Sequence, residues 1–233
     1  MRAVFGKLTY SSLRGRIADE IQEAILTGAL HEGERIVERK LAGQFSTSLT
    51  AVREALIELE AKGFVTKKPN CATYVIKFSV EAADQIFAFR KVVEAHTIEE
   101  AARTASPAQL ESLEAAYDEL MQAAVANDTR LYLQRDLALH ERAWHASNNE
   151  YFEIALKRVV RPFFAFTAIR LDVRQAFDLA QDAKHHLGFV KPIQLRQPAA
   201  ARDAYLRALD EWYRQTHAYV LDENCNASAG SSL

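Results

Sequence analysis

Arg53 and Thr50 have the side-chain chemistry and the position to read a nucleic acid. Apolar residues recur at helical spacing over 52–59 and form one stripe, so Arg53 and Thr50 face the other way at the start of that helix. A guanidinium can bond guanine in two places or grip a phosphate. The alternative is a solvated ion pair between Arg53 and Glu54 or Glu58, but the surrounding motif favours the DNA contact.

A second pair of residues could bind a metal ion. Asp136 and His140 are four residues apart, so on a helix both side chains leave from the same side. Pairs at this spacing arise freely on helices, so the spacing alone is weak evidence.

The segments around Arg53 predict a winged helix-turn-helix. We expect short helices at 35–45 and 49–62 with a tight turn between them. Extended pieces at 64–67 and 73–76 flank a turn pair at 69–70 and predict a two-stranded wing. This layout is typical of proteins that place the first turn of the second helix in the DNA major groove.

The run GERIVERKLAGQFSTSLTAVREALIELEAKGFV, residues 33–65, resembles the reading head of the GntR family of bacterial transcription regulators. The residues on the family pattern are Gly33, Arg35, Glu38, Leu41, Ala42, Ser48, Val52, Arg53, Glu54, Ala55, Leu56, Leu59, Gly63 and Val65. This chain has Leu49 where the family has a base-reading arginine, and Ala72 where the family wing has a glycine. One lost arginine contact removes about 1–3 kcal/mol of base discrimination, so we expect a shifted operator.

The resemblance and the residue chemistry together give one set of predicted DNA contacts. Ser48 or Thr50 can cap the second helix, whose exposed amides favour a phosphate. The full set is Arg35, Arg39, Ser48, Leu49, Thr50, Arg53, Lys67, Lys68, Ala72 and Thr73.

The remainder of the chain predicts a helical body. Between Gly63 and Gly188 no glycine occurs, and apolar residues recur at steps of three and four. A capping box at 106–109 starts one helix, and Pro162 and Pro192 should kink or split two others. We expect body helices at 79–105, 107–126, 129–147, 150–174, 176–196 and 198–221, after a first helix at 9–29 in the head.

The charge distribution predicts two domains, and the composition predicts the cellular compartment. Residues 1–77 carry 12 Lys/Arg and 9 Asp/Glu, while residues 78–233 carry 17 and 22, so a basic head precedes an acidic body. We expect a DNA-binding domain at 1–77, a helical effector-binding and dimerisation domain at 78–222 and a disordered tail at 223–233. The absence of a long apolar run or signal sequence, with two unpaired cysteines, predicts a cytoplasmic, nucleoid-associated protein with no membrane contact.

The body, over 79–221, resembles the FCD-type ligand-sensing half of FadR-like GntR regulators, an all-helical antiparallel bundle. The fold class is therefore mainly α. The residues that carry the resemblance are Arg90, Glu94, Asp136, His140, Asn149 and His186. All of these except Glu94 are implied to bind an organic-acid effector, with Arg90 meeting its carboxylate. An ion pair between Arg90 and Glu94 is the alternative.

The same resemblance implies that Asp136, His140 and His186 hold a divalent metal: Zn, Ni or Mn. The family's fourth ligand, a histidine, falls at Ala208 here, and Glu211 is the nearest substitute. Three alternatives stay open: a three-ligand site completed by water or effector, a metal-free polar pocket, or ordinary hydrogen-bonded core residues.

These observations predict a transcription regulator that binds a palindromic operator as a homodimer and responds to a small organic acid. Repression is the favoured direction of control. One alternative is a metal-dependent hydrolase or lyase that uses Asp136, His140 and His186. Another is a helical adaptor with a vestigial head, for which Leu49 and Ala72 are the support.

Overall fold

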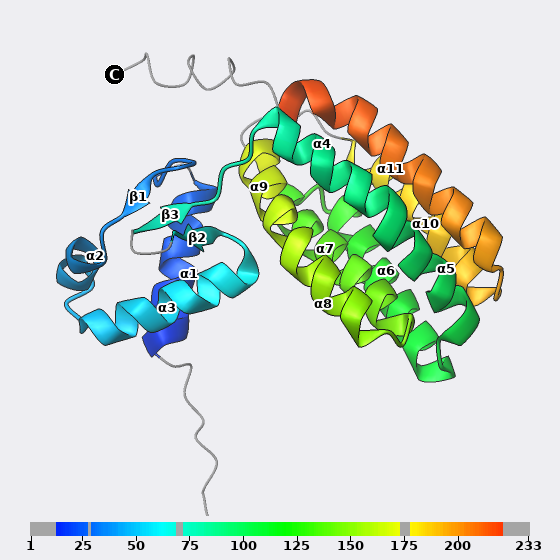
Figure 1. Ribbon diagram of the computed structural model, residues 1–233, viewed down its shortest axis with the longest axis horizontal. Coiled ribbons are helices and arrows are strands. Elements are labelled where there is room, and N and C mark those ends of the chain that lie inside the picture. Colours follow the sequence, from blue (N-terminus) through cyan, green and yellow to red (C-terminus); the bar gives the residue numbers. More distant parts are fainter. Residues whose placement is uncertain (1–12, 28, 69–71, 173–177, 221–233) are drawn as a thin grey trace, which may run out of the picture. The chain divides into compact units, whose positions relative to one another are not determined.

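The computed structural model describes residues 13–27, 29–68, 72–172 and 178–220, which form two compact units, Met1–Lys77 and Phe78–Leu233 (Figure 1). The predicted tail at 223–233, the turn pair at 69–70 and the start of the predicted first helix at 9–12 lie outside the described residues.

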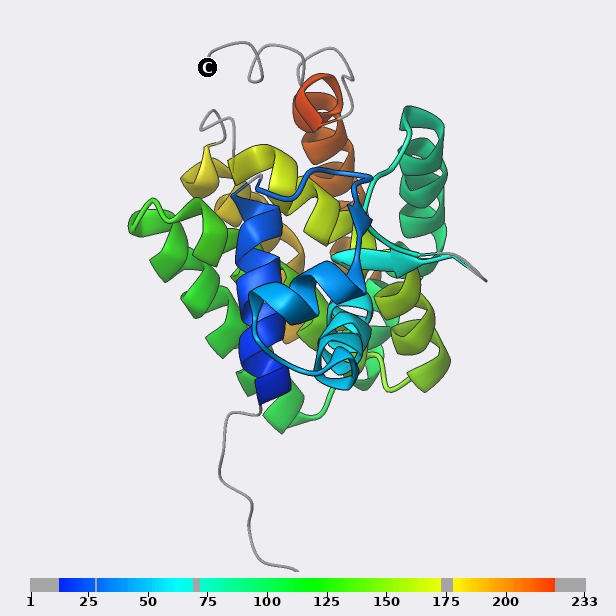
Figure 2. The ribbon, with the colours of Figure 1, turned by 90° about the vertical axis from the view of Figure 1, so that its left-hand side faces the viewer.

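The first unit is a small helical domain with one sheet. Its elements are α1 (Leu13–Leu26), β1 (Arg35–Ile36), α2 (Glu38–Gln44), α3 (Leu49–Lys62), β2 (Val65–Lys67) and β3 (Thr73–Val75). Helices α1 and α2 both pack against α3 (Figures 1 and 2). Ile21, Ile25 and Leu59 are fully buried in this unit, so its core is aliphatic.

The sheet has three strands in the order β1-β3-β2, where we had predicted two. Residues 35–36 were expected to begin a helix, but they pair antiparallel with β3, with Ile36 opposite Thr73. Gly33 has a φ of 74°, which turns the chain before this strand. Burial of the β-branched Ile36 at 3% exposure favours the strand, and the helix begins only at Glu38.

Helix α3 has the predicted bounds because a capping residue stands at each of its ends. The Ser48 side chain accepts a hydrogen bond from the Ala51 amide at the start. At the end, Gly63 takes the left-handed conformation with a φ of 86°.

The second unit is a bundle of helices, as predicted (Figure 1). The elements are α4 (Val80–Phe89), η1 (Arg90–Glu94), α5 (Ala95–Thr104), α6 (Pro107–Val125), α7 (Thr129–Ala146), α8 (Glu150–Val159), α9 (Arg161–Asp172), α10 (Leu179–Gln194) and α11 (Pro198–Val220). Trp144, Leu156, Val160 and Phe164 form one buried cluster in it. No helix of the described ranges combines the length and apolarity that crossing a membrane requires.

Two details of the bundle differ from the sequence prediction, and one confirms it. The helix expected at 79–105 contains a π-helical turn, η1, at its centre. The helix expected at 150–174 divides at Val160, as predicted from Pro162, which suits the first turn of a new helix. Pro192 lies in the last turn of α10, which continues to Gln194 without a break.

Candidate nucleic-acid interface and candidate metal centre

One groove on the first unit gathers most of the predicted DNA contacts. Seven of them line it, together with Ile36, Val37 and Glu38: Arg35, Arg39, Leu49, Arg53, Lys67, Ala72 and Thr73. Four of these side chains are basic, and Glu38 is the acidic one among the lining residues. A basic groove beside the first turn of α3 has the charge that a phosphate backbone requires.

Arg53 points into this groove from α3 and pairs with Glu38 of α2. Its Nε lies 2.7 Å from Glu38 Oε2, while the two side chains are 61% and 26% exposed. The expected alternative partners, Glu54 and Glu58, are not the ones found, and Glu58 instead pairs with Arg14 and Lys62. An exposed pair of this kind is weak, so Arg53 can exchange Glu38 for DNA.

The other predicted contacts lie around the groove in different settings. Thr50 is exposed in the first turn of α3, and Ser48 caps that helix. The Lys68 ammonium lies 4.9 Å from the centroid of the Tyr74 ring. Thr73 is 6% exposed, so its hydroxyl is poorly placed to meet DNA.

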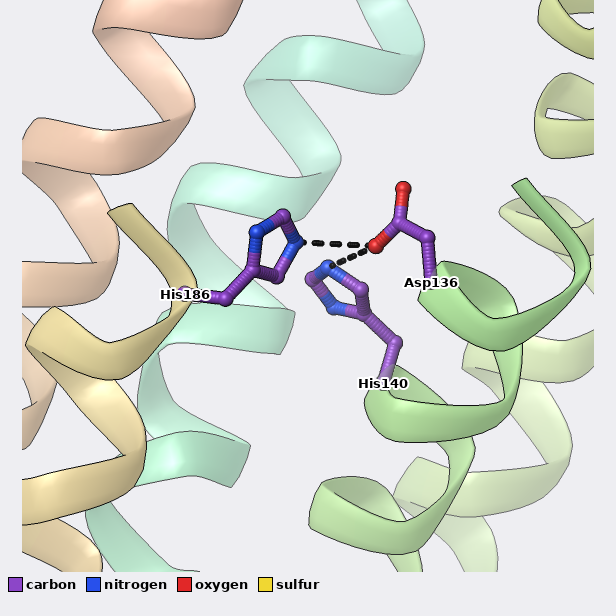
Figure 3. A group of neighbouring side chains, drawn as sticks. All are labelled: Asp136, His140 and His186. Carbon is purple, nitrogen blue, oxygen red and sulfur yellow. Dashed lines mark ion pairs between the residues drawn. The ribbon is translucent and has the colours of Figure 1, made fainter. Parts of the chain in front are cut away.

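In the second unit, three potential metal ligands converge from two helices (Figure 3). Asp136 and His140 come from α7, and His186 comes from α10. Asp136 Oδ1 lies 2.8 Å from His186 Nε2 and 3.5 Å from His140 Nε2. All three residues are buried, so the site is shielded from bulk water.

Hydrogen bonds behind the two histidines fix which ring nitrogen faces the site. His140 Nδ1 lies 2.8 Å from Glu94 Oε1, and His186 Nδ1 lies 2.9 Å from the Asp182 carbonyl oxygen. Both of those oxygens only accept, so each Nδ1 carries the proton in a neutral ring. Each Nε2 then directs a lone pair toward Asp136, the arrangement that orients histidine ligands around metals.

The carboxylate of Asp136 lies in a setting that a divalent metal would satisfy. Its Oδ1 is buried and has no hydrogen bond among the described residues, although His186 Nε2 is within 2.8 Å. Two lone pairs aimed at one carboxylate oxygen repel unless a cation or a proton lies between them. One oxygen and two imidazole nitrogens suit zinc, nickel or manganese, so the residues present fit a divalent metal.

Without metal, a proton between His186 and Asp136 can relieve this repulsion. Burial acts to lower the pKa of His186, but the carboxylates of Asp136 and Asp182 outweigh it and raise this pKa to about 9. Burial acts to raise the pKa of Asp136, but His186 and His140 hold it below its ordinary value. A charged His186 beside an ionised Asp136 is therefore the metal-free form of the site.

Arg90 and Glu94 form a buried ion pair beside this site. Arg90 Nε lies 2.6 Å from Glu94 Oε2, and the side chains are 6% and 0% exposed. Glu94 Oε1 also accepts from the Trp144 indole at 2.9 Å. Burial acts to raise the pKa of Glu94, but Arg90 and His140 hold it well below its usual range.

A cavity of about 40 Å³ adjoins the three ligands, and Arg90 lines it with them. Ala208 on α11 forms part of its wall, so no histidine stands there. Glu211 does not line this cavity, and its carboxylate accepts from Arg214 and Gln215.

Asn149 is placed elsewhere, which corrects its expected part in effector binding. Its Oδ1 accepts from the amides of Tyr151 and Phe152, so it is the N-cap of α8. It lines a different groove that includes His96 and Glu100.

Sequence reasoning missed several residues of this site. Tyr205 lines the cavity from α11, and Asp182 holds His186 while accepting from Tyr132 at 2.7 Å. Tyr205 stands three residues before Ala208, so helical spacing from the missing family ligand could have revealed it.

Two family models match the chain in sequence. "Bacterial regulatory proteins, gntR family" matches residues 13–75, and "FCD domain" matches residues 85–211, more than half of the chain. Among curated proteins, the HTH-type transcriptional regulator McbR of Escherichia coli K12 is 27% identical over 61% of this chain. That match spans 65% of the McbR chain. The gluconate operon transcriptional repressor of Bacillus licheniformis is 23% identical over 92% of this chain and 88% of its own.

Solved structures share the fold. The structure titled "E. coli McbR/YncC" has a TM-score of 0.70 at 18% identity and covers 89% of this chain and 98% of its own. A GntR regulator from Rhodococcus sp. RHA1, described as putative in its title, has a TM-score of 0.68 at 18% identity, with coverages of 88% and 97%. The sequence matches, the winged head and the helical bundle agree: this chain belongs to the FCD-domain transcription regulators of the GntR family.

Proposed function

We propose that residues 1–77 bind a DNA operator and that residues 78–222 bind an effector and join two copies of the chain. DNA binding is supported by the groove beside the first turn of α3, which is lined by Arg35, Arg39, Arg53 and Lys67. One short recognition helix reads few base pairs, so two heads on a palindromic operator would supply the required specificity. Such binding would place the protein on the nucleoid in the cytoplasm.

The proposed effector is a small organic acid bound in the cavity of the bundle. Arg90 offers a fixed positive charge there, and Asp136, His140 and His186 would hold a zinc, nickel or manganese ion. Such a metal would supply Lewis-acid chemistry, held by the three ligands that the chain offers, since Ala208 stands where the family has a fourth. An effector changes operator affinity only by its different affinity for the free and DNA-bound states.

Repression is the proposed direction of control. The relatives named as repressors are those of the gluconate operon of Bacillus licheniformis and, as a probable one, the D-xylose utilization operon of Paenarthrobacter nicotinovorans. The proposal that this chain represses rests on that likeness.

Two other functions have less support. A hydrolase or lyase could use an open metal site to activate water, but the named relatives are transcription regulators. A helical adaptor with a vestigial head would have no need for the basic groove beside α3, which persists despite Leu49 and Ala72.

The test is to capture genomic DNA fragments on the purified protein, wash at moderate salt and sequence them. We expect one recurrent palindromic motif, with the Arg53→Ala variant as the matched control that loses it. Random recovery by the wild-type protein, with or without small organic acids, would overturn the operator proposal. Turnover of ester or amide substrates by zinc-loaded protein would support the enzyme instead.

A further inference from the structure

We infer that the buried cavity of the second unit is entered between α10 and α11, through a mouth formed by His185, Ala208 and Trp212, and that the His185 side chain is the gate of this mouth. This inference rests on the proposed function, because the ligand that must pass the mouth is the divalent cation of the three-ligand site. The gate sets how fast the cation is exchanged, which the ligand geometry alone does not determine.

The exposure of the residues around the cavity locates the mouth. Among the described residues that line the cavity, all are buried except His185, Ala208 and Trp212, which are half-buried. His185 comes from α10, whereas Ala208 and Trp212 come from α11 and lie one helical turn apart, on the same side of that helix. Helices α10 and α11 pack against each other (Figure 1). The part of the cavity wall that reaches solvent is therefore the junction of these two helices.

A groove on the outer surface of α10 and α11 reaches the same junction. His185 and Ala208 line both this groove and the cavity. Since each of the two residues faces both spaces, the partition between groove and cavity is one side chain thick at this point. The cavity is thus separated from solvent there by the imidazole of His185 and the methyl group of Ala208.

The mouth residues differ in how firmly they are held. The ring of Trp212 stacks on Phe87 with centroids 5.5 Å apart and lies edge-on to Phe163 at 6.1 Å. The ring of His185 accepts a hydrogen bond at Nε2 from the amide of the exposed Gln181, over 3.2 Å. Water readily replaces an exposed bond of this kind. Rotation of the His185 side chain would therefore open the mouth without movement of either helix.

A gate changes the rates of entry and exit and leaves the affinity unchanged. The ligand atoms that could hold the cation come from Asp136, His140 and His186, and His185 is not part of that group. A mouth residue that does not touch the bound cation alters the barrier equally in both directions, so Kd, the ratio of the two rate constants, stays constant. A fourth ligand would change that ratio instead.

Stopped-flow binding of Co²⁺ to the full-length protein tests the gate. The two tryptophans of the chain both lie near the site, since Trp144 donates to Glu94 beside His140 and Trp212 lines the cavity. Quenching of their fluorescence therefore reports the arrival of cobalt.

Two substitutions should move the rate constants of Co²⁺ binding in opposite directions. We expect His185→Ala to raise association and dissociation about threefold or more, and Ala208→Leu to lower both about tenfold or more, with Kd within about twofold of wild type. Lys184→Ala is the matched control, because Lys184 lines the groove but not the cavity, and it should leave both rates unchanged. Equal urea midpoints in the three variants would confirm that the fold is intact.

A second measurement needs no metal. His186→Cys, with both native cysteines changed to serine, places a single thiol in the cavity wall. The rate at which methyl methanethiosulfonate modifies this thiol reports the passage of a small neutral molecule. Adding His185→Ala should raise that rate, adding Ala208→Leu should lower it, and adding Lys184→Ala should leave it unchanged.

Unchanged rates of cobalt binding and of thiol modification in both His185→Ala and Ala208→Leu would overturn the inference, because the entrance would then lie elsewhere. A tenfold weaker Kd in His185→Ala at an unchanged association rate would make His185 a ligand rather than a gate. If Co²⁺ does not bind the wild type, the proposed metal site fails, and the thiol rates alone decide where the cavity opens.

Discussion

Two ion pairs of nearly equal geometry have opposite settings in the two units. In the head, Arg53 Nε lies 2.7 Å from Glu38 Oε2, and 61% of the arginine side chain is exposed. In the bundle, Arg90 Nε lies 2.6 Å from Glu94 Oε2, and the side chains are 6% and 0% exposed. Water screens the first pair, so it is exchangeable, whereas breaking the second leaves an unpaired charge in the core. The distance between two charges therefore says little about their role until burial is known.

Removal of Glu94 should give the largest effect. Glu94→Ala leaves Arg90, His140 and Trp144 without their common acceptor. We expect a loss of about 3–5 kcal/mol in the free energy of unfolding, measured by urea denaturation. The double variant Arg90→Met with Glu94→Leu should recover part of this stability. A loss below about 1 kcal/mol for Glu94→Ala would contradict the view that burial separates the two ion pairs.

Metal removal should give the next largest effect. At a free metal concentration 100 times Kd, binding adds about 2.7 kcal/mol to the stability of the folded state. Chelation should therefore lower Tm, and metal return should restore it. His186→Ala should show neither response. The same Tm with zinc, with nickel and with chelator would favour a metal-free pocket.

Arg53→Ala should affect binding and leave stability nearly unchanged. We expect operator affinity to fall by about 1–3 kcal/mol, or roughly 5- to 150-fold, measured by fluorescence anisotropy with the captured operator. Its unfolding free energy should stay within about 0.5 kcal/mol of wild type. Equal loss of affinity for operator and random DNA would instead assign Arg53 to a phosphate contact.

The smallest effect is expected for Glu38→Gln, which removes the exposed partner of Arg53. The unfolding free energy should change by less than about 1 kcal/mol. Operator affinity should rise slightly at low salt, because Arg53 no longer has a competing carboxylate and the groove loses its acidic residue. A loss of several kcal/mol in stability would show that exposure does not separate the two ion pairs.

The sequence predicted features that depend on neighbouring residues. Helix α3 has its predicted bounds, because Ser48 and Gly63 act within one turn of its ends. The capping box of Ser106 and Gln109 is present at the start of α6 for the same reason. The convergence of Asp136, His140 and His186 also followed the family resemblance, and the structure brings their donor atoms within 4.8 Å of one another.

The features that could not be predicted from the sequence depend on residues far apart in the chain. Strand β1 has two residues, and its partner β3 lies almost 40 positions later. The choice of Glu38 by Arg53, rather than a helical neighbour, needs the packing of α2 against α3. The family resemblance implied that Asn149 binds the effector, but its amide oxygen caps α8 instead.

The π-helical turn at Arg90–Glu94 makes this segment tolerant of a one-residue deletion. A π turn holds one residue more than the α turn it replaces, so the helices on either side keep nearly the same phase when that residue is lost. Deleting the exposed Val92 would let the segment relax to regular α-helix with little rotation of α4 relative to α5. Arg90 and Glu94 stand at the two ends of the turn, and at a spacing of three residues they would still lie on one face of the helix. Natural variation at position 92 should therefore include gaps as well as exchanges of residue type.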